Sequence, residues 1–193
     1  MPIEIEAKMK IPGPEPVLQA LRDSGASHEG DHIETDTFFD TKDRTLLAAD
    51  KGLRLRVAHN LKTNRSHCLL THKGPAGHGP LKKREETETT VGNPDATTRL
   101  LQQLGFVQWL RYQKRRQSWK LDNCKVELDE IPHLGHFVEI EGPSDDAVMR
   151  LREKLGLSSL TPIKASYVAM LTAHLQERGD PTTEILLNDS MSQ

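Results

Sequence analysis

The chain has 193 residues, which suits one domain with a core of ordinary size, and 28% of them are Asp, Glu, Lys or Arg. A formal net charge of -2 argues against a nucleic-acid-binding protein that depends on overall basicity. No stretch approaches the length of a membrane span, no room is left for a signal peptide, and Cys68 and Cys124 lack metal-ligand spacing, so we expect a cytoplasmic protein without membrane contact or a disulfide scaffold.

The first predicted element is a strand over residues 3–11, in which apolar and charged residues alternate strictly. This period of two gives the strand one apolar face and one charged face. The charged face carries Glu4, Glu6, Lys8 and Lys10. An edge strand with a solvated outer face would explain one such strand. The same pattern recurs along the chain, which favours a common purpose for the charged faces.

Further strands and helices follow, joined by turns. We predict helices over residues 15–24, 94–104, 144–155 and 164–178, with Asn93 and Ser144 as N-caps and Gly25 and Gly105 as stop signals. We predict strands over residues 28–39, 52–57, 66–73, 81–91, 106–121 (as one strand or two), 124–131 and 137–142. A loop with a helical turn is expected over 42–49, and a mobile loop rich in Gly and Pro over 74–80. Residues 1–178 would form a single domain, followed by a flexible polar tail over 179–193.

One parity of the strands is dominated by Glu, Asp, Arg and Lys, often as like-signed neighbours two residues apart. Examples are Arg54 with Arg56, Lys114 with Arg116, Glu127 with Asp129, and Glu139 with Glu141. Like charges this close repel each other and gain little from an unpaired surface. They are better explained by a partner: carboxylate pairs suit a hard divalent cation, and Arg and Lys pairs suit phosphate oxygens.

The apolar parity of the strands also needs a partner. If the strands close into a barrel with their apolar faces outward, the amphipathic helices can cover those faces. The lumen would then be lined by acids and bases and should hold water, metal and anion, because charged walls are costly to dry. Periodicity alone does not force this topology.

The order of the charged motifs resembles one known family. Glu4-Ile5-Glu6-Ala7-Lys8 resembles the Glu-x-Glu-x-Lys signature that opens the CYTH family, also called triphosphate tunnel metalloenzymes. Further matching motifs follow in order: Leu53-Arg54-Leu55-Arg56, Thr71-His72-Lys73-Gly74, Arg84-Glu85-Glu86-Thr87-Glu88, Lys114-Arg115-Arg116, Glu127-Leu128-Asp129, Glu139-Ile140-Glu141 and Lys164-Ala165-Ser166-Tyr167. The resemblance runs from residue 3 to about residue 175.

The resemblance implies an α+β fold, a closed antiparallel eight-stranded β-barrel that forms a tunnel, with helices packed on the outside. It also implies binding of a linear triphosphate together with divalent metal, Mg or Mn. Members of the family include class IV adenylyl cyclases, thiamine triphosphatases, inorganic tripolyphosphatases and fungal RNA triphosphatases.

Site residues carry over from the same motifs. The expected metal ligands are Glu4, Glu6, Glu86, Asp129, Glu139 and Glu141. The expected phosphate-binding residues are Lys8, Arg54, Arg56, Lys73, Lys82, Arg84, Lys114, Arg116 and Lys164. The expected catalytic residues among them are Lys8, Lys73, Glu86 and Arg116. A structural role is an equal alternative for Lys82, Glu88 and Glu127, Arg115 has the wrong parity for the lumen, and Tyr167 is expected to pack.

Three functions remain open on the sequence. We favour hydrolysis of a phosphoanhydride bond in an inorganic or organic triphosphate. The alternative is a class IV adenylyl cyclase that converts ATP to cyclic AMP and pyrophosphate, since residues 128–141 resemble the bacterial cyclase-like branch. A non-catalytic polyphosphate-binding module is the third, although a pure anion binder has no use for so many acids. Nucleic acid is not an expected partner because the cations are interleaved with acids and aromatic residues make up 4% of the chain; a homodimer is left open.

Overall fold

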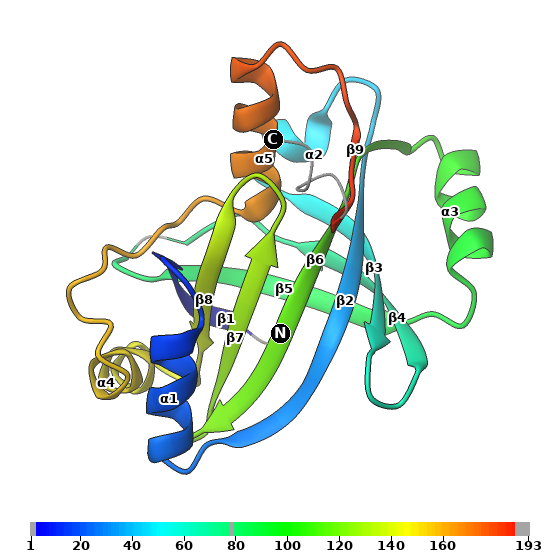
Figure 1. Ribbon diagram of the computed structural model, residues 1–193. Coiled ribbons are helices and arrows are strands. Elements are labelled where there is room, and N and C mark those ends of the chain that lie inside the picture. The colour runs from blue at the N-terminus through cyan, green and yellow to red at the C-terminus, as the bar shows by residue number, and fades with distance from the viewer. Residues whose placement is uncertain (1–2, 78, 188–193) are drawn as a thin grey trace.

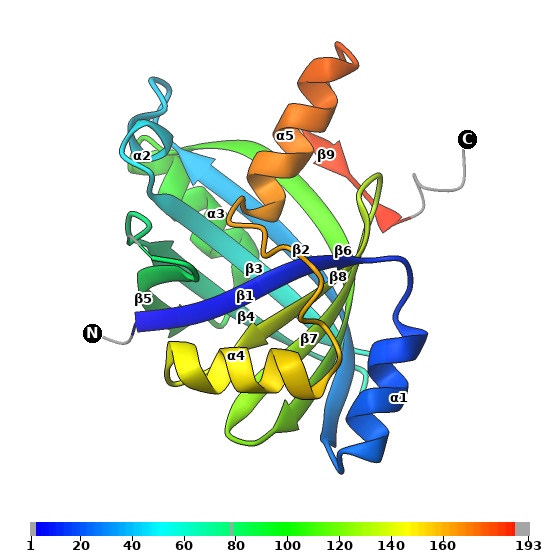
Figure 2. The same ribbon diagram turned by 90° about the vertical axis from the view of Figure 1, so that its left-hand side faces the viewer.

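The computed structural model describes residues 3–77 and 79–187, and its strands form a closed antiparallel barrel (Figures 1 and 2). The eight strands of the barrel are β1 (Ile3–Ile11), β2 (Ser27–Asp40), β3 (Gly52–Asn60), β4 (Arg65–Lys73), β5 (Lys82–Thr90), β6 (Val107–Leu121), β7 (Cys124–Ile131) and β8 (Gly135–Glu141). Their order is β2-β3-β4-β5-β1-β8-β7-β6, and the pairing of β2 with β6 closes the ring. The expected fold class and eight-stranded barrel are confirmed.

Five helices occur in the described residues: α1 (Glu15–Asp23), α2 (Thr45–Ala48), α3 (Pro94–Gln103), α4 (Asp145–Lys154) and α5 (Tyr167–Glu177). Asn93 and Ser144 cap α3 and α4 as predicted, since each side chain accepts a hydrogen bond from a backbone N–H three residues later. Helix α5 begins three residues later than predicted because Ser166 is extended and caps it. Lys164 therefore lies in the segment before this helix.

The segment after α5 is attached to the barrel. Strand β9 (Glu184–Ile185) pairs in parallel with Arg111 and Tyr112 of β6, and Ile185 is buried. Residues 184–185 are therefore ordered, unlike the flexible tail expected over 179–193, because Ile185 packs against α5 and β6. His78 of the expected loop, residues 1–2 of the expected domain and residues 188–193 of the tail lie outside the described residues.

Helices cover the apolar outer faces of the strands. One buried cluster joins β1, β7 and β8 to α1 and α4, and it includes Met9, Val138, Leu21 and Leu151. A second cluster packs Leu171 of α5 against the barrel. Burying a large aliphatic side chain contributes about 1.5–3 kcal/mol, so these contacts hold the helices in place. Figures 1 and 2 show α1 and α4 beside β1, β7 and β8, with α5 at one end of the barrel.

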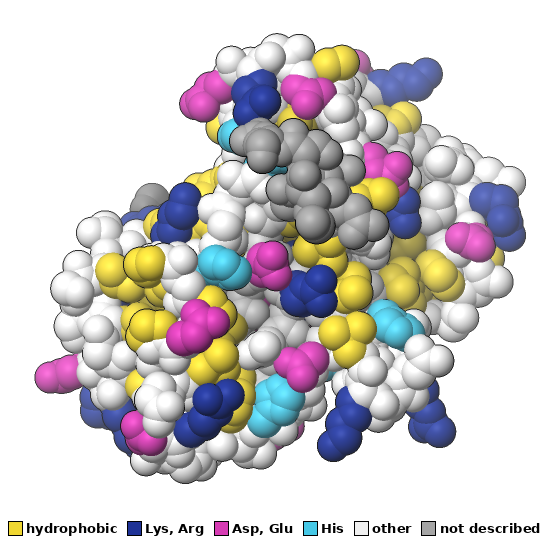
Figure 3. Space-filling model, viewed as in Figure 1, with side chains coloured by type: hydrophobic (Ala, Val, Ile, Leu, Met, Phe, Trp, Pro, Cys, Tyr) yellow, Lys and Arg dark blue, Asp and Glu magenta, His cyan; other side chains and the backbone are white. Residues whose placement is uncertain are grey.

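The inner faces of the strands are charged. The charged residues buried there include Glu6, Lys8, Glu34, Asp36, Arg56, Lys82, Lys114, Arg116, Glu127 and Asp129. Other acidic and basic side chains lie on the outer surface, where Figure 3 shows them mixed over one face of the molecule. Buried charges are costly without partners, and clusters of them often mark functional sites. The lumen is therefore the candidate functional site.

Candidate active site

The barrel encloses a cavity of about 1070 Å³. It brings together nearly all of the site residues predicted from the sequence, which come from β1, β3, β4, β5, β6 and β8 and from the segment before α5. Those that line it are Glu4, Glu6, Lys8, Arg54, Arg56, Lys73, Lys82, Arg84, Glu86, Lys114, Arg116, Glu139, Glu141 and Lys164. Of the predicted site residues, only Asp129 lies behind this lining.

Carboxylates gather on neighbouring inward positions of β1 and β8. The strand register sets Glu6 opposite Glu141 and Lys8 opposite Glu139. Burial and a hydrogen bond to Glu86 raise the pKa of Glu4. Burial and the nearby charge of Glu4 raise the pKa of Glu141. These carboxyl groups therefore crowd one another, and an added cation would stabilise their charged forms.

Glu4, Glu6, Glu139 and Glu141 together form an acidic wall of the cavity. Lysines lie beside this acidic wall. The Lys73 ammonium donates to Glu4 at 3.1 Å and forms a closer ion pair with Glu86. Lys82 donates to Glu6 at 2.6 Å, and Glu6 with the other carboxylates raises the pKa of Lys82 against the opposing effect of burial. Lys82 thus faces the lumen. Of the two roles expected for it, phosphate binding and a structural role, phosphate binding remains available.

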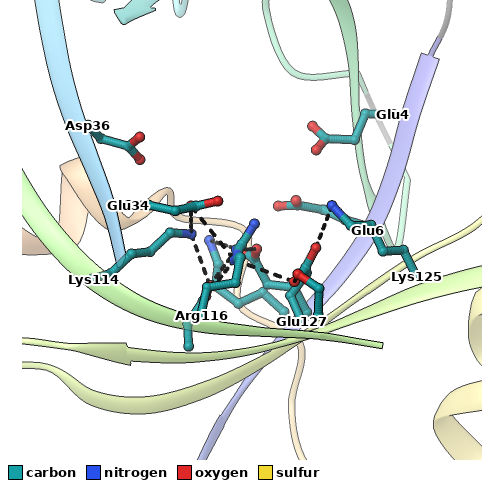
Figure 4. Close-up of polar contacts among 12 residues, drawn as sticks. Glu4, Glu6, Glu34, Asp36, Lys114, Arg116, Lys125 and Glu127 are labelled. Atoms are coloured by element: carbon teal, nitrogen blue, oxygen red, sulfur yellow. Dashed lines mark hydrogen bonds and ion pairs between the residues drawn. The ribbon is translucent and has the colours of Figure 1, made fainter. Parts of the chain in front are cut away.

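The opposite wall is a network of cations held by buried carboxylates (Figure 4). Glu34 lies 2.9 Å from the Arg56 guanidinium and 3.2 Å from the Lys114 ammonium. Burial raises the pKa of Glu34, but these cations and Arg116 outweigh it and hold the pKa well below its usual range. Figure 4 shows Glu34 and Asp36 pointing into the lumen across from Glu4 and Glu6.

Arg116 connects the two walls. Its guanidinium donates to Glu139 at 2.6 Å and forms a two-pronged contact with Asp129. Lys8 lies 3.5 Å from Glu139, and Arg116 and Lys8 hold the Glu139 pKa well below its usual range, against the opposing effect of partial burial. Because both Asp129 oxygens are taken by Arg116 and Lys114, this environment suits a residue that orients Arg116.

Other predicted residues lie nearer the rim. Arg84 donates to Asp50 at 2.6 Å, and Lys164 donates to the backbone carbonyl of Gly79 at 2.6 Å. Arg54 donates to the Thr71 hydroxyl at 3.3 Å. Arg54 also lies 3.9 Å from carboxylate oxygens of Asp36 and Glu88. To bind phosphate oxygens, these three cations would exchange their present partners for them.

The remaining charged positions divide between the two faces of the barrel. Glu88 accepts a hydrogen bond from the Thr71 hydroxyl, and buried Glu127 accepts one from Ser118 at 2.7 Å, so both have structural partners inside the barrel. Arg115 points outward, as its parity predicts, and lies 3.4 Å from exposed Glu130.

Sequence reasoning missed part of the lumen. Glu34 and Asp36 were not singled out, although they are a like-signed pair two residues apart, the same signal that identified the other strands. The polar start of β2 conceals this pair among residues with no clear alternation. Tyr167 packs on Phe137 as expected, but its ring centroid also lies 4.3 Å from the Lys8 ammonium and 5.1 Å from Lys114. It therefore also forms part of the cation site.

The donor chemistry of the acidic wall fits a hard divalent cation. Carboxylate oxygens are the ligands that Mg prefers, and no thiolate takes part. Within residues 3–77 and 79–187, no three Asp, Glu, His or Cys side chains are already arranged around one point as metal ligands. The carboxylates would have to exchange their lysine and arginine partners for the cation. The residues thus fit Mg or Mn by type and by strand position.

Asp36→Asn is expected to lower the free energy of unfolding, and to lower it more at neutral pH than at acidic pH. Asp36 is fully buried and receives two hydrogen bonds from Arg56, at 2.6 and 2.7 Å. Burial raises the Asp36 pKa, but Arg56 and Arg54 outweigh it and bring it from 3.8 to about 2. Because the folded pKa is the lower one, the stabilisation is present above about pH 4 and is lost as the pH falls toward 2, a change of roughly 2 kcal/mol.

Urea unfolding of both proteins at about pH 7, 4 and 2.5 measures this. The gap between wild type and Asp36→Asn should narrow as the pH falls, whereas Asp31→Asn, at a more exposed position of β2, should change little at any pH. A gap that stays constant across this range would show that the charge of Asp36 is not what stabilises the fold.

Comparison with known protein families adds independent information. The family model of the CYTH domain matches residues 2–167 of the chain. A candidate adenylate cyclase from Methanocaldococcus jannaschii is 25% identical over 177 residues, which cover 87% of this chain and 98% of that protein. The adenylate cyclase CyaB of Aeromonas hydrophila is 27% identical over 147 residues, 71% of each chain.

Solved structures have the same architecture. A protein from Pyrococcus horikoshii OT3 superposes with a TM-score of 0.78 at 26% identity, covering 89% of this chain and 99% of that chain. A Hippeastrum protein, described as a candidate adenylyl cyclase with a dominant triphosphatase activity, has a TM-score of 0.68 at 20% identity, covering 90% of this chain and 96% of that chain. At that identity the second likeness shows the fold alone. No helix in the described residues is long and apolar enough to cross a membrane.

Proposed function

This chain belongs to the CYTH domain family, and from that premise we propose that it is a divalent-metal-dependent enzyme that hydrolyses a phosphoanhydride bond of a linear triphosphate. The observation that carries the proposal is the division of one lumen into an acidic wall and a basic wall. Glu4, Glu6, Glu139 and Glu141 share neighbouring inward positions, while Arg56, Lys114 and Arg116 converge from β3 and β6. An anion site alone would not need the acidic wall.

The basic wall would bind the phosphates. A triphosphate carries about four negative charges near neutral pH, so positioning and charge neutralisation dominate its chemistry. Arg56, Lys114 and Arg116 already converge on the carboxylate of Glu34. Phosphate oxygens entering this region would compete with Glu34 for the same donors. Arginine and lysine together supply both fork-shaped and point-charge contacts to phosphate.

The acidic wall would hold the metal, and a carboxylate beside it would accept the proton of the attacking water. Bound Mg or Mn would supply Lewis-acid polarisation of the phosphoryl oxygens. Between Glu4 and Glu86, the hydrogen bond raises the pKa of Glu4, while Glu86 has a lowered pKa because this bond and Lys73 outweigh its burial. Glu86 is the member of the pair that stays ionised, and in this proposal it would accept a proton from the attacking water. Lys73, in contact with both carboxyl groups, would orient the pair.

A second candidate function is cyclisation of ATP to cyclic AMP and pyrophosphate. It is favoured by the names of the relatives from M. jannaschii and A. hydrophila, both of which refer to adenylate cyclase. In this reaction the ribose 3′-hydroxyl attacks the α-phosphate, and the same cations and carboxylates would bind the phosphate chain. The two functions differ in the nucleophile.

Product analysis distinguishes the candidates. Purified protein is incubated with tripolyphosphate and, in parallel, with ATP, each with Mg²⁺ or Mn²⁺. We expect orthophosphate from at least one of them and no cyclic AMP. Excess chelator should abolish turnover and added Mn²⁺ should restore it, because the acidic wall needs its cation. Cyclic AMP plus pyrophosphate would replace our proposal with the second candidate, and tight binding without any product would leave a binding module.

A further inference from the structure

The two arginines on the inner face of β3 are held differently. Arg56 donates two hydrogen bonds to the Asp36 carboxylate, at 2.6 and 2.7 Å, and also lies 2.9 Å from Glu34. Arg54 lies 3.9 Å from carboxylate oxygens of Asp36 and Glu88, which is beyond hydrogen-bond distance. Among the described residues, the Nε atom of Arg54 is buried and has no hydrogen-bond partner. Of the two, Arg54 therefore offers the more available guanidinium to a ligand in the cavity.

A single hydroxyl group anchors this guanidinium. Strand pairing sets Thr71 of β4 opposite Arg54 on one side and opposite Glu88 of β5 on the other. The Thr71 hydroxyl accepts a hydrogen bond from Arg54 Nη2 at 3.3 Å and donates one to Glu88 Oε2 at 2.7 Å. Thr71 is fully buried. Because a guanidinium can only donate, the hydroxyl proton points toward Glu88 and the lone pairs of the oxygen face Arg54.

A neutral anchor suits an arginine that has to bind phosphate. A carboxylate in direct contact would compete with phosphate oxygens for the guanidinium and would repel them. The Thr71 hydroxyl fixes one nitrogen of the planar fork without adding a charge, and the direction of the other donors is then fixed as well. The carboxylate behind it, Glu88, has a side chain that is 41% exposed, so solvent screens part of its charge.

We propose that Thr71 is a positioning residue that orients Arg54 toward the phosphates of the substrate. The inference rests on the proposed function and goes beyond it, because the sequence pattern assigned Thr71 to neither metal nor phosphate. Thr71 acts through Arg54. Its hydroxyl holds a long side chain in one conformation before the ligand arrives, which lowers the entropic cost of binding.

Calorimetry with Mg²⁺ and inorganic diimidotriphosphate, which resists hydrolysis, tests this role. Thr71→Val keeps the shape of the side chain but removes the hydroxyl, and we expect it to raise the dissociation constant about tenfold. Thr71→Ser restores the hydroxyl and should recover most of the affinity. Thr89→Val removes a hydroxyl from an exposed, outward position of β5 and should bind as the wild type does. Thermal melting of each variant checks that it is folded.

A double-mutant cycle shows whether Thr71 acts through Arg54. In an Arg54→Met background, Thr71→Val should change the dissociation constant less than about twofold, because the group that Thr71 positions is absent. A purely structural role of Thr71 would instead lower the melting temperature and weaken binding by the same factor in both backgrounds.

Three results would overturn the role of Thr71. They are wild-type affinity in Thr71→Val, a Thr71→Ser variant as weak as Thr71→Val, and an equal loss of affinity with and without the Arg54 guanidinium. Each of these leaves the proposed function standing, because the wild type still binds the triphosphate. If the wild type neither binds diimidotriphosphate nor hydrolyses a triphosphate, the proposed function itself fails and the positioning role fails with it.

Discussion

Replacing Glu4 and Glu6 together by Gln should abolish turnover of whichever triphosphate the wild type hydrolyses. Both side chains line the acidic wall on adjacent inward positions of β1. The amides keep the size and one acceptor oxygen but lose the two charges that would hold a divalent cation. We expect a loss of about 10³-fold or more in kcat, equivalent to about 4 kcal/mol of transition-state stabilisation.

A matched control separates catalysis from general charge effects. Glu130→Gln removes one carboxylate from an exposed, outward position of β7, where its partner is Arg115. It should leave kcat and melting temperature near those of the wild type. Calorimetry of Mn²⁺ binding should show affinity lost in the double variant alone. Full activity or unchanged Mn²⁺ affinity in the double variant would contradict the assignment of the acidic wall.

Arg116→Gln should produce the largest loss of stability of any single lumen substitution considered. The Arg116 guanidinium is the shared partner of Asp129 and Glu139 and lies 3.7 Å from Glu127. Burial lowers the Arg116 pKa, but Asp129, Glu127 and Glu34 outweigh it and raise the pKa well above its usual range. Removing the cation leaves buried carboxylates without their partner, which typically costs about 3–5 kcal/mol.

The neighbouring residue supplies the control. Arg115→Gln changes the same residue type one position along β6, but its side chain is exposed and paired only at the surface. Urea unfolding should give a change within about 0.5 kcal/mol for Arg115→Gln. Arg116→Lys keeps a charge without the fork and should fall between wild type and Arg116→Gln. Equal effects of the Arg115 and Arg116 substitutions would mean that the inward network does not stabilise the barrel.

The local pattern of this chain predicts much of its barrel. Strict alternation over residues 3–11 and the like-signed pairs on later strands identify which face of each strand is charged, and the structure places those faces inward. Alternation works here because side chains in a strand point to opposite faces with a period of two. The helix caps at Asn93 and Ser144 are equally local and were predicted correctly.

The features that the sequence did not predict depend on contacts between residues far apart in the chain. The pairing of β2 with β6 closes the barrel, yet their residues lie about eighty positions apart and no local signal encodes the pairing. The start of α5 was misplaced because residues 164–166 lie outside the helix and Ser166, which is extended, supplies the cap. The depth of Asp129 follows from how the strands meet in space, which the parity of one strand does not reveal.

The central claim is that the lumen holds a triphosphate and a divalent metal at the same time. The most direct test is a crystal structure with Mn²⁺ and β,γ-imido-ATP, in which the anomalous signal of Mn locates the metal. The account predicts a Mn peak about 2 Å from oxygens of Glu4, Glu6, Glu139 or Glu141, with phosphates among Arg56, Lys114 and Arg116. A metal or a phosphate chain bound outside the lumen would contradict it.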